Sequence, residues 1–135
     1  MFCFIFKIYF YISYTNSFRS APAVSGAAPK PRSWHAAAEL SQKRVLIHGG
    51  YDGDLALYDA HVFDLRAKSW TALTLDPAPL RPRAGHSAIM LTSKYDEEKE
   101  DEVLVFGGGD NDGAYFDEML SIYVPVPEFG AMMNF

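Results

Sequence analysis

The chain has 135 residues, of which 49% are hydrophobic and 21% charged, as expected for one small globular domain that can bury a core. Its formal net charge of −5 provides no basic footprint, which argues against nucleic-acid binding. The single cysteine, Cys3, excludes an internal disulfide framework and favours a reducing compartment, so a cytoplasmic location is expected.

Residues 1–28 differ in composition from the rest of the chain. The stretch "MFCFIFKIYFYISY" has twelve apolar or aromatic residues in fourteen, too few for a membrane span of about 20 residues. It could be a signal peptide cleaved at "APA" (21–23), although Lys7 interrupts the apolar run. It could also be an extra strand packed on the domain, or a leader foreign to the native protein. The following "SAPAVSGAAPKP" indicates a linker, so we expect folded structure to begin near residue 30.

The remaining sequence repeats itself. "PRSWHAAAEL" (31–40) matches "PRAGHSAIML" (82–91) at an offset of 51 residues. "VLIHGG" (45–50) matches "VLVFGG" (103–108) at an offset of 58, because "SKYDEEKED" lengthens the second copy by seven residues. The sequence therefore predicts two units, residues 29–80 and residues 81–135.

Later matches continue the repeat with one further slip. The offset of 58 is expected to hold through Asp59 and Asp117, and Trp70 then faces Phe129 at an offset of 59. Both length changes fall where loops or bulges would tolerate them.

Each unit carries four strand signals and no sustained helical periodicity. In the first unit the strands are expected at 35–40, 43–48, 58–65 and 69–74, separated by turn residues. A period near 50 with about four strands per unit is typical of a β-propeller blade. Small residues in the first strand and a large aromatic in the fourth would fill the tapering space of such a blade. The predicted fold class is therefore all-β.

These motifs together resemble the kelch repeat family. Within about residues 29–129 each unit has Pro-Arg, then His, then an apolar strand ending in Gly-Gly, an acidic third strand and a late aromatic residue. The resemblance implies propeller blades of four antiparallel strands, and it assigns a structural role to Arg32, His35, Gly49, Gly50, Asp59, Trp70, Arg83, His86, Gly107, Gly108 and Phe129. The second unit departs from the pattern, because Phe129 replaces tryptophan and "VPVPEF" is interrupted by proline.

Two units make an incomplete propeller, since a closed ring needs about four to eight blades. A repeat unit buries its faces against its neighbours, so isolated units are expected to be marginal. We expect the missing blades to come from a longer chain, of which this sequence is a fragment, or from self-association. The third alternative is that the exposed blade faces have no partner and leave the chain only marginally stable.

The duplicated polar residues favour structural roles. The paired glycines lack the following Lys and helix that a phosphate-binding loop requires, so they are expected to permit a tight strand exit beside a neighbouring blade. Arg32 and Arg83, like His35 and His86, recur at equivalent positions, which is unlike a catalytic residue. Hydrogen bonding to carbonyls of neighbouring strands explains them better.

Metal and cofactor sites are weakly supported. His48 and His61 could meet across the sheet, but a zinc site needs about three or four ligands. "GGGDNDGAYFDE" (107–118) fails as a calcium loop because Met119 stands where the last glutamate ligand belongs. Metalloenzymes that resemble kelch propellers require a tyrosine–histidine–cysteine or carboxylate cluster at the mouth of the propeller. Cys3 is the only cysteine of the chain and lies outside the repeats. We expect no cofactor and no catalytic residues.

The expected function is a non-catalytic protein-interaction scaffold or adaptor whose partner is another protein. Large or charged tips of loops are the expected contacts, namely Tyr51, Asp52, Asp54 and Tyr115. The acidic run "DEEKEDE" (96–102) is expected to be a solvated loop extension that a basic partner could use. Two alternatives remain open: an accessory propeller domain of a larger enzyme, and a structural remnant without activity.

Overall fold

The computed structural model describes residues 9–12, 17–20, 24–75, 80–91 and 99–128. In these ranges the regular structure is β-strand apart from one short 3-10 turn, Ser41–Lys43, so the all-β prediction is confirmed. None of the described residues belongs to a helix long and apolar enough to cross a membrane. The strands are β1 (Tyr9–Ile12), β2 (Ser17–Ser20), β3 (Ser25–Gly26), β4 (Ala36–Leu40), β5 (Arg44–Tyr51), β6 (Ala56–Asp64), β7 (Ser69–Leu73), β8 (Ser87–Leu91), β9 (Glu100–Phe106) and β10 (Met119–Pro125).

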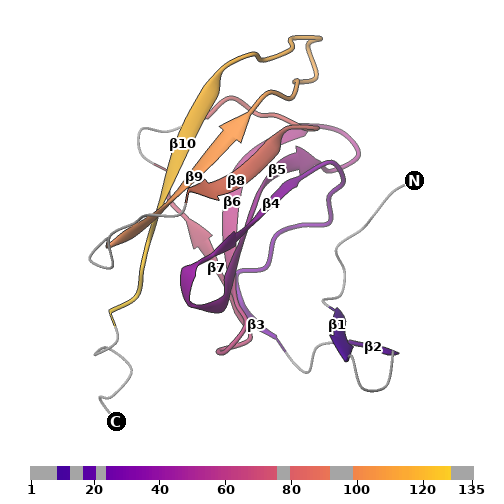
Figure 1. Ribbon diagram of the computed structural model, residues 1–135. Coiled ribbons are helices and arrows are strands. Elements are labelled where there is room, and N and C mark those ends of the chain that lie inside the picture. The colour runs from indigo at the N-terminus through magenta and orange to yellow at the C-terminus, as the bar shows by residue number, and fades with distance from the viewer. Residues whose placement is uncertain (1–8, 13–16, 21–23, 76–79, 92–98, 129–135) are drawn as a thin grey trace.

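The first repeat forms a sheet with the strand order β3-β7-β6-β5-β4 (Figure 1). Strands β4 to β7 pair antiparallel in sequence order, at positions close to those predicted. Strand β3 adds to the free edge of β7 in parallel, and Ser25 N donates to Lys68 O at 3.2 Å. Ordered structure therefore begins before residue 30, because part of the expected linker covers an edge that would otherwise expose unpaired backbone groups.

The second repeat forms a separate sheet with the order β10-β9-β8, and β1 and β2 pair in a small sheet of their own. Both pairings in the second sheet are antiparallel. The expected fourth strand of this unit would contain Phe129, which lies outside the described residues. Within the described ranges the two larger sheets are adjacent layers and not a closed ring (Figure 1).

The turn after the second strand differs by one residue between the repeats. In the first, Asp52 Oδ1 accepts hydrogen bonds from the backbone N–H groups of Asp54 and Leu55, at 3.0 and 2.8 Å. In the second, Asp110 Oδ1 accepts from Asp112 and Ala114, both at 2.9 Å. These are tight turns closed by an aspartate side chain, and the second contains one extra residue.

The extra residue shifts the alignment of the third strands. The offset of 59 begins in this turn, well before Trp70, so the match of Asp59 with Asp117 is wrong. The structure places Glu118 at the position that corresponds to Asp59, since each accepts a hydrogen bond from the buried arginine of its own repeat. A turn tolerates an inserted residue because it has no fixed pairing partner across a sheet.

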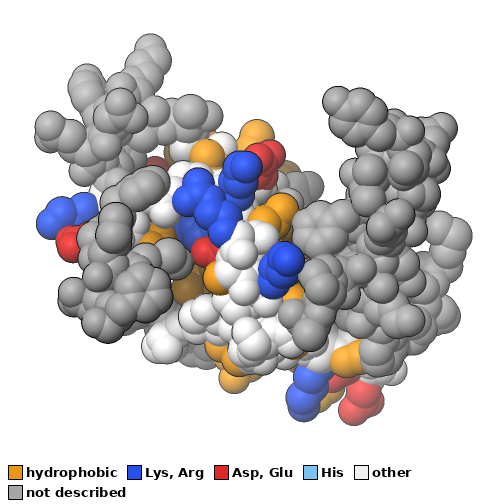
Figure 2. Space-filling view, turned by 90° about the horizontal axis from the view of Figure 1, so that it is seen from below, with side chains coloured by type: hydrophobic (Ala, Val, Ile, Leu, Met, Phe, Trp, Pro, Cys, Tyr) orange, Lys and Arg blue, Asp and Glu red, His pale blue; other side chains and the backbone are white. Residues whose placement is uncertain are grey.

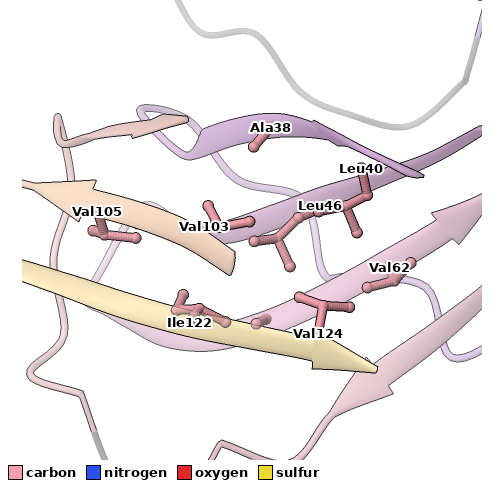
Figure 3. Close-up of a cluster of buried hydrophobic side chains, with 9 residues drawn as sticks. Ala38, Leu40, Leu46, Val62, Val103, Val105, Ile122 and Val124 are labelled. Atoms are coloured by element: carbon pink, nitrogen blue, oxygen red, sulfur yellow. The ribbon is translucent and has the colours of Figure 1, made fainter. Parts of the chain in front are cut away.

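The core lies between the two sheets, where β4 and β8 run next to each other. Alternate residues of each strand point into it, as expected for sheets with one face packed. Leu46, Val103 and Val105 are fully buried there. Figure 3 shows the cluster, whose members are Ala38, Leu40, Leu46, Ala60 and Val62 from the first sheet and Val103, Val105, Ile122 and Val124 from the second. The two repeats thus share one hydrophobic core.

A buried ion pair joins the two sheets at the lower end of Figure 1, where the β4–β5 turn lies. Arg44 Nη2 donates to Asp101 Oδ2 at 2.8 Å, and both side chains are buried. Arg44 Nη1 also donates to Pro125 O, and Ser41 Oγ donates to Asp101 Oδ2 at 2.9 Å. Figure 2 shows Lys and Arg side chains gathered at this end. The pairing satisfies both buried charges and fixes one sheet against the other.

Candidate functional site

Each repeat contains one fully buried arginine. Arg32 donates to Gly49 O at 3.0 Å and binds the Asp59 carboxylate through two hydrogen bonds of 2.6 and 2.9 Å. Arg83 donates to Gly107 O at 3.0 Å and to Glu118 Oε1 at 2.8 Å. Burial raises the pKa of Asp59, but hydrogen bonds from Arg32 and His61 outweigh it and hold that pKa at about 2. The arginines therefore hold the loops at the strand ends in place.

Gly49 allows the two sheets to approach closely. Its φ of +60° is unfavourable for other residues, and a Cβ here would lie 2.7 Å from Arg83 O of the second repeat. The next residue, Gly50, donates its N–H to the same carbonyl at 2.9 Å. Gly49 is thus required by the contact between the repeats, whereas a Cβ at Gly50 would collide with Ser33 O of its own repeat, at 2.6 Å.

The histidines are arranged differently from the expectation that His48 and His61 meet. The β5–β6 register pairs His48 with Ala60, which places His61 on the opposite face of the sheet. His61 contacts Asp59 Oδ2 at 2.8 Å, and His48 Nδ1 shares a hydrogen bond of 2.9 Å with His86 Nε2 of the second repeat. In the part of the chain that the structure describes, no group of three potential metal ligands occurs.

The His48 and His86 rings are buried at the contact between the sheets. Burial, together with the neighbouring His86 and Arg83, lowers the pKa of His48 from 6.5 to about 3. Burial and the charge of Arg83 lower the pKa of His86 to about 4. Both rings are therefore neutral in the folded protein at neutral pH, and protonation opposes folding.

We expect the free energy of unfolding to fall as the pH drops from about 6.5 toward 4. The unfolded chain takes up protons near the ordinary histidine pKa of 6.5, whereas the folded protein resists protonation until about 4 for His86 and 3 for His48. Stability from the neutral pair is complete above 6.5 and is lost at up to about 1.4 kcal/mol per pH unit for each histidine. Asp59, whose pKa is lowered from 3.8 to about 2, affects the pH dependence of the free energy of unfolding only at more acidic pH.

Urea unfolding at several pH values between about 7 and 5 measures this slope. The matched variant is His48→Phe, which introduces the residue that the second repeat carries at Phe106. Its stability should depend less steeply on pH than that of the wild type. An equally steep dependence would show that the buried pair is not the cause.

The candidate interaction residues gather at one end of the sheets, which we call the loop end and define as segments 33–35, 51–55 and 110–115. Tyr115 is 91% exposed there, and Asp54 is also exposed. Asp52 closes its own turn, and Tyr51 is half-buried with its hydroxyl donating to Gly53 O. All four predicted contact residues thus lie at the loop end, but only some present free side-chain tips.

Asn111 joins the two loops of this end. Its side-chain amide donates to Asp54 O at 2.9 Å, and its Oδ1 accepts from the backbone N–H of Ala56. Loops from two repeats therefore form one continuous surface. The acidic run behaves differently: 96–98 lies outside the described residues, and 100–102 begins β9, with Asp101 buried against Arg44. The expectation of a loop is wrong for residues 100–102, which form a strand. Of these three residues only Asp101 is buried by the ion pair, and Glu100 is exposed.

A hollow of about 680 Å³ opens beside these loops. Carboxylates line it from both repeats, together with apolar side chains and two cationic ones. Its lining includes Asp52, Leu55, Tyr58, Asp59, Asp110, Asn111 and Asp112, together with Lys30, Arg32 and His61. Hydrogen bonds from the N–H groups of Leu55 and Asp54 lower the pKa of Asp52, so this carboxylate is charged at neutral pH. The hollow can receive a side chain that is both apolar and cationic.

Trp34 is a further residue of the loop end that the sequence reasoning missed. Its side chain is 63% exposed, and its ring lies 5.9 Å from the ring of Tyr51. Its backbone has a φ of +52°, which is rare for a bulky residue. The second repeat has Gly85 at the same position, with a φ of +71°. The mismatch between "PRSWH" and "PRAGH" was the signal that could have identified it.

Comparisons with known proteins agree with the motifs. No family model matches the chain. It is 35% identical over 92 residues to the flagellar outer-arm dynein alpha chain of Chlamydomonas reinhardtii, covering 68% of this chain and 2% of that protein. It is 32% identical over 90 residues to human Kelch domain-containing protein 1, covering 66% of this chain and 20% of that protein. It is 28% identical over 103 residues to the rat Rab9 effector protein with kelch motifs, covering 74% of this chain and 25% of that protein.

The chain is similar to kelch-domain proteins. It spans no more than a quarter of the length of the three relatives named above. The likeness therefore concerns the repeats and not the whole relatives.

Proposed function

We propose that this chain contributes two adjacent blades of a kelch-type propeller and serves as a non-catalytic scaffold or adaptor that binds a protein partner at the loop end. Relatives with kelch names and two antiparallel sheets related by an internal repeat support the proposal. The single observation that carries the assignment to the loop end is the exposed, backbone-strained Trp34 beside Tyr51.

Trp34 has the properties of a binding anchor. Tryptophan and tyrosine dominate the energetics of protein interfaces, and they do so on rigid scaffolds where little side-chain freedom is lost. Backbone strain of this kind costs about 1–3 kcal/mol and persists mainly at functional positions. Gly85 shows that the fold itself does not need an aromatic side chain at this position.

The charges around the hollow indicate the chemistry of the partner. Asp52, Asp110 and Asp112 contribute three carboxylates from two loops, while Arg32 is already paired with Asp59. A partner segment with a lysine or arginine next to an apolar residue would complement this surface, because opposite potentials steer association. An acidic segment would be repelled.

Selection of a random peptide library on the immobilised full chain tests the proposal. We expect enriched peptides to carry basic and apolar residues, and Trp34→Gly to weaken their binding about tenfold or more, equivalent to about 1.4 kcal/mol. The same variant should change the free energy of unfolding by less than about 1 kcal/mol, because glycine relieves the strained φ.

Arg66→Glu is the matched control, since Arg66 is exposed in the β6–β7 turn at the opposite end of the sheets. It should bind the selected peptides as the wild type does. The assignment to the loop end fails if Trp34→Gly binds them equally well, or if Arg66→Glu alone abolishes binding.

A further inference from the structure

The segment that leads into the first repeat lies along the first sheet. Residues 24–30, which we call the strap, form β3 beside β7 and continue to the hollow at the loop end. Ser25 N donates to Lys68 O at 3.2 Å, and Ala27 N donates to Trp70 O at 3.1 Å. Figure 1 shows β3 at the lower end of the first sheet, so the strap runs from that end toward the loop end.

The strap is held by few contacts. Apart from Pro29, every residue of the strap is exposed. His61 Nδ1 donates to Ala27 O at 2.9 Å, and Arg32 Nε donates to Lys30 O at 3.0 Å. Backbone hydrogen bonds at an exposed edge open readily, because water can replace each partner. The strap contributes no residue to either core cluster, so it can leave the sheet while the core stays packed.

Gly26 determines how closely the strap approaches β7. Its φ is +88°, and a Cβ at this position would lie 2.0 Å from Trp70 O. Any other residue here would both strain the backbone and collide with β7. A substitution of Gly26 therefore detaches the strap without altering the repeats.

Lys30 brings a positive charge to the acidic hollow. This hollow of about 680 Å³ is lined by Ala28 and Lys30 of the strap together with carboxylates of both repeats. Hydrogen bonds from the backbone N–H groups of Leu55 and Asp54 lower the pKa of Asp52, and the charge of Lys30 lowers it further. Lys30 is therefore the strap's counter-charge to the loop that contains Asp52.

The strap has the chemistry that the hollow favours in a partner. Its sequence "AAPK" (27–30) places a lysine directly after small apolar residues. The partner segment proposed for the loop end likewise carries a lysine or arginine next to an apolar residue. The chain therefore presents to its own hollow a short segment that resembles the expected ligand.

The internal repeat shows that the fold does not require this placement of Lys30. At the offset of 51, Arg81 matches Lys30. Each accepts through its backbone oxygen from the buried arginine two residues later, at 3.4 and 3.0 Å respectively. The guanidinium of Arg81, however, lies over the ring of Phe116, 5.6 Å from its centroid. The backbone hydrogen bond thus recurs, whereas the cation that lines the hollow comes from the first repeat.

We propose that the strap is an autoinhibitory element that closes one side of the hollow until a partner segment of the same chemistry displaces it. The partner's cation takes the place of Lys30 near Asp52. Its backbone then finds His61 Nδ1 and Trp70 O free to form the hydrogen bonds that the strap gives up. This inference rests on the function proposed above, because it concerns how access to the same hollow is regulated.

Calorimetric titration of the full chain with the most enriched peptide from the loop-end selection tests the proposal. Gly26→Val should bind this peptide about fivefold more tightly than the wild type, because a partner that must displace the strap binds in proportion to the fraction of molecules whose strap is open. Ser25→Val is the matched control. It adds the same side chain one residue earlier, where the chain is extended and exposed, and it should bind as the wild type does.

A pair of charge variants tests the role of Lys30. Lys30→Glu removes the counter-charge of the strap and should also tighten peptide binding about fivefold. Lys99→Glu makes the same change of charge on the second sheet, beside a separate hollow that Lys99 and Tyr123 line, and should change the affinity by less than about twofold. This pair keeps the test decisive even if Gly26→Val does not fold.

Hydrogen–deuterium exchange provides a readout that does not depend on affinity. The amides of Ser25 and Ala27 should exchange faster in Gly26→Val, and also in the wild type once the peptide saturates it, while the amides of β5 stay protected. The strap has no inhibitory role if Trp34-dependent binding is unchanged in Gly26→Val and Lys30→Glu, or if the bound peptide leaves the strap amides protected; the binding site itself then stands. Absence of Trp34-dependent binding in every variant overturns both proposals.

Discussion

Leu46→Ala is expected to lower the free energy of unfolding by about 3 kcal/mol, because truncating a fully buried leucine removes its transfer energy and leaves a cavity. Leu46 is completely inaccessible and packs in the cluster between the two sheets, next to Val103 and Val62 (Figure 3). Urea unfolding followed by tryptophan fluorescence measures the change. The loss should affect both sheets together, since they share this core.

Leu104→Ala is the matched control for this prediction. Leu104 occupies the same position in the second repeat, but it is half-buried on the face of the second sheet that points away from the shared core. In dilute protein its truncation should cost about 1 kcal/mol, because little apolar contact is lost. Equal losses for the two variants would contradict the packing described for the first and second sheets.

Glu118→Ala is expected to lower the free energy of unfolding by about 2 kcal/mol. Arg83 is fully buried, and removing Glu118 leaves its guanidinium without the carboxylate 2.8 Å away. Removal of one partner of a buried pair costs about 3–5 kcal/mol, and the 42% exposure of the Glu118 side chain reduces that figure through solvent screening. Chemical denaturation at neutral pH measures the difference.

Asp117→Ala distinguishes the two possible alignments of the repeats. Asp117 is exposed, and the sequence match at an offset of 58 equates it with Asp59. The structure assigns that role to Glu118, so Asp117→Ala should change stability by less than about 0.5 kcal/mol. A large loss in Asp117→Ala with none in Glu118→Ala would restore the alignment expected from sequence alone.

The strands of the first repeat were predictable because the apolar pattern and the turn residues indicate the same strand positions. The apolar runs that end in Gly-Gly, and the small residues before them, gave the positions of β4, β5, β8 and β9. Local pattern suffices for such elements, since burial on a sheet face imposes it directly.

The position of the one-residue insertion, which changes the offset between the repeats from 58 to 59, was not predictable from the sequence. Its position depends on which backbone N–H groups bond to Asp52 and Asp110, and an aspartate accepts from several neighbours equally well. The pairing of His48 with His86 was not predictable either, because it depends on how two sheets pack and not on spacing within one. Strand β3 has only two residues and no apolar pattern.

Part of the candidate site followed from the sequence. Tyr51, Asp52, Asp54 and Tyr115 were expected at loop tips, and all four lie at the loop end. Trp34 was missed because it sits inside a motif whose other residues, Arg32 and His35, were interpreted as structural. Its left-handed backbone conformation became visible only in the structure.

Hydrogen–deuterium exchange of the full chain tests most directly the central claim that the two repeats form one unit with a shared core. The amides of β5 and β9, each the second strand of its repeat, should exchange slowly and with the same free energy of opening, and Leu46→Ala should lower both by the same amount. Rapid exchange in β9 beside slow exchange in β5, or a Leu46→Ala effect confined to β5, would contradict the claim.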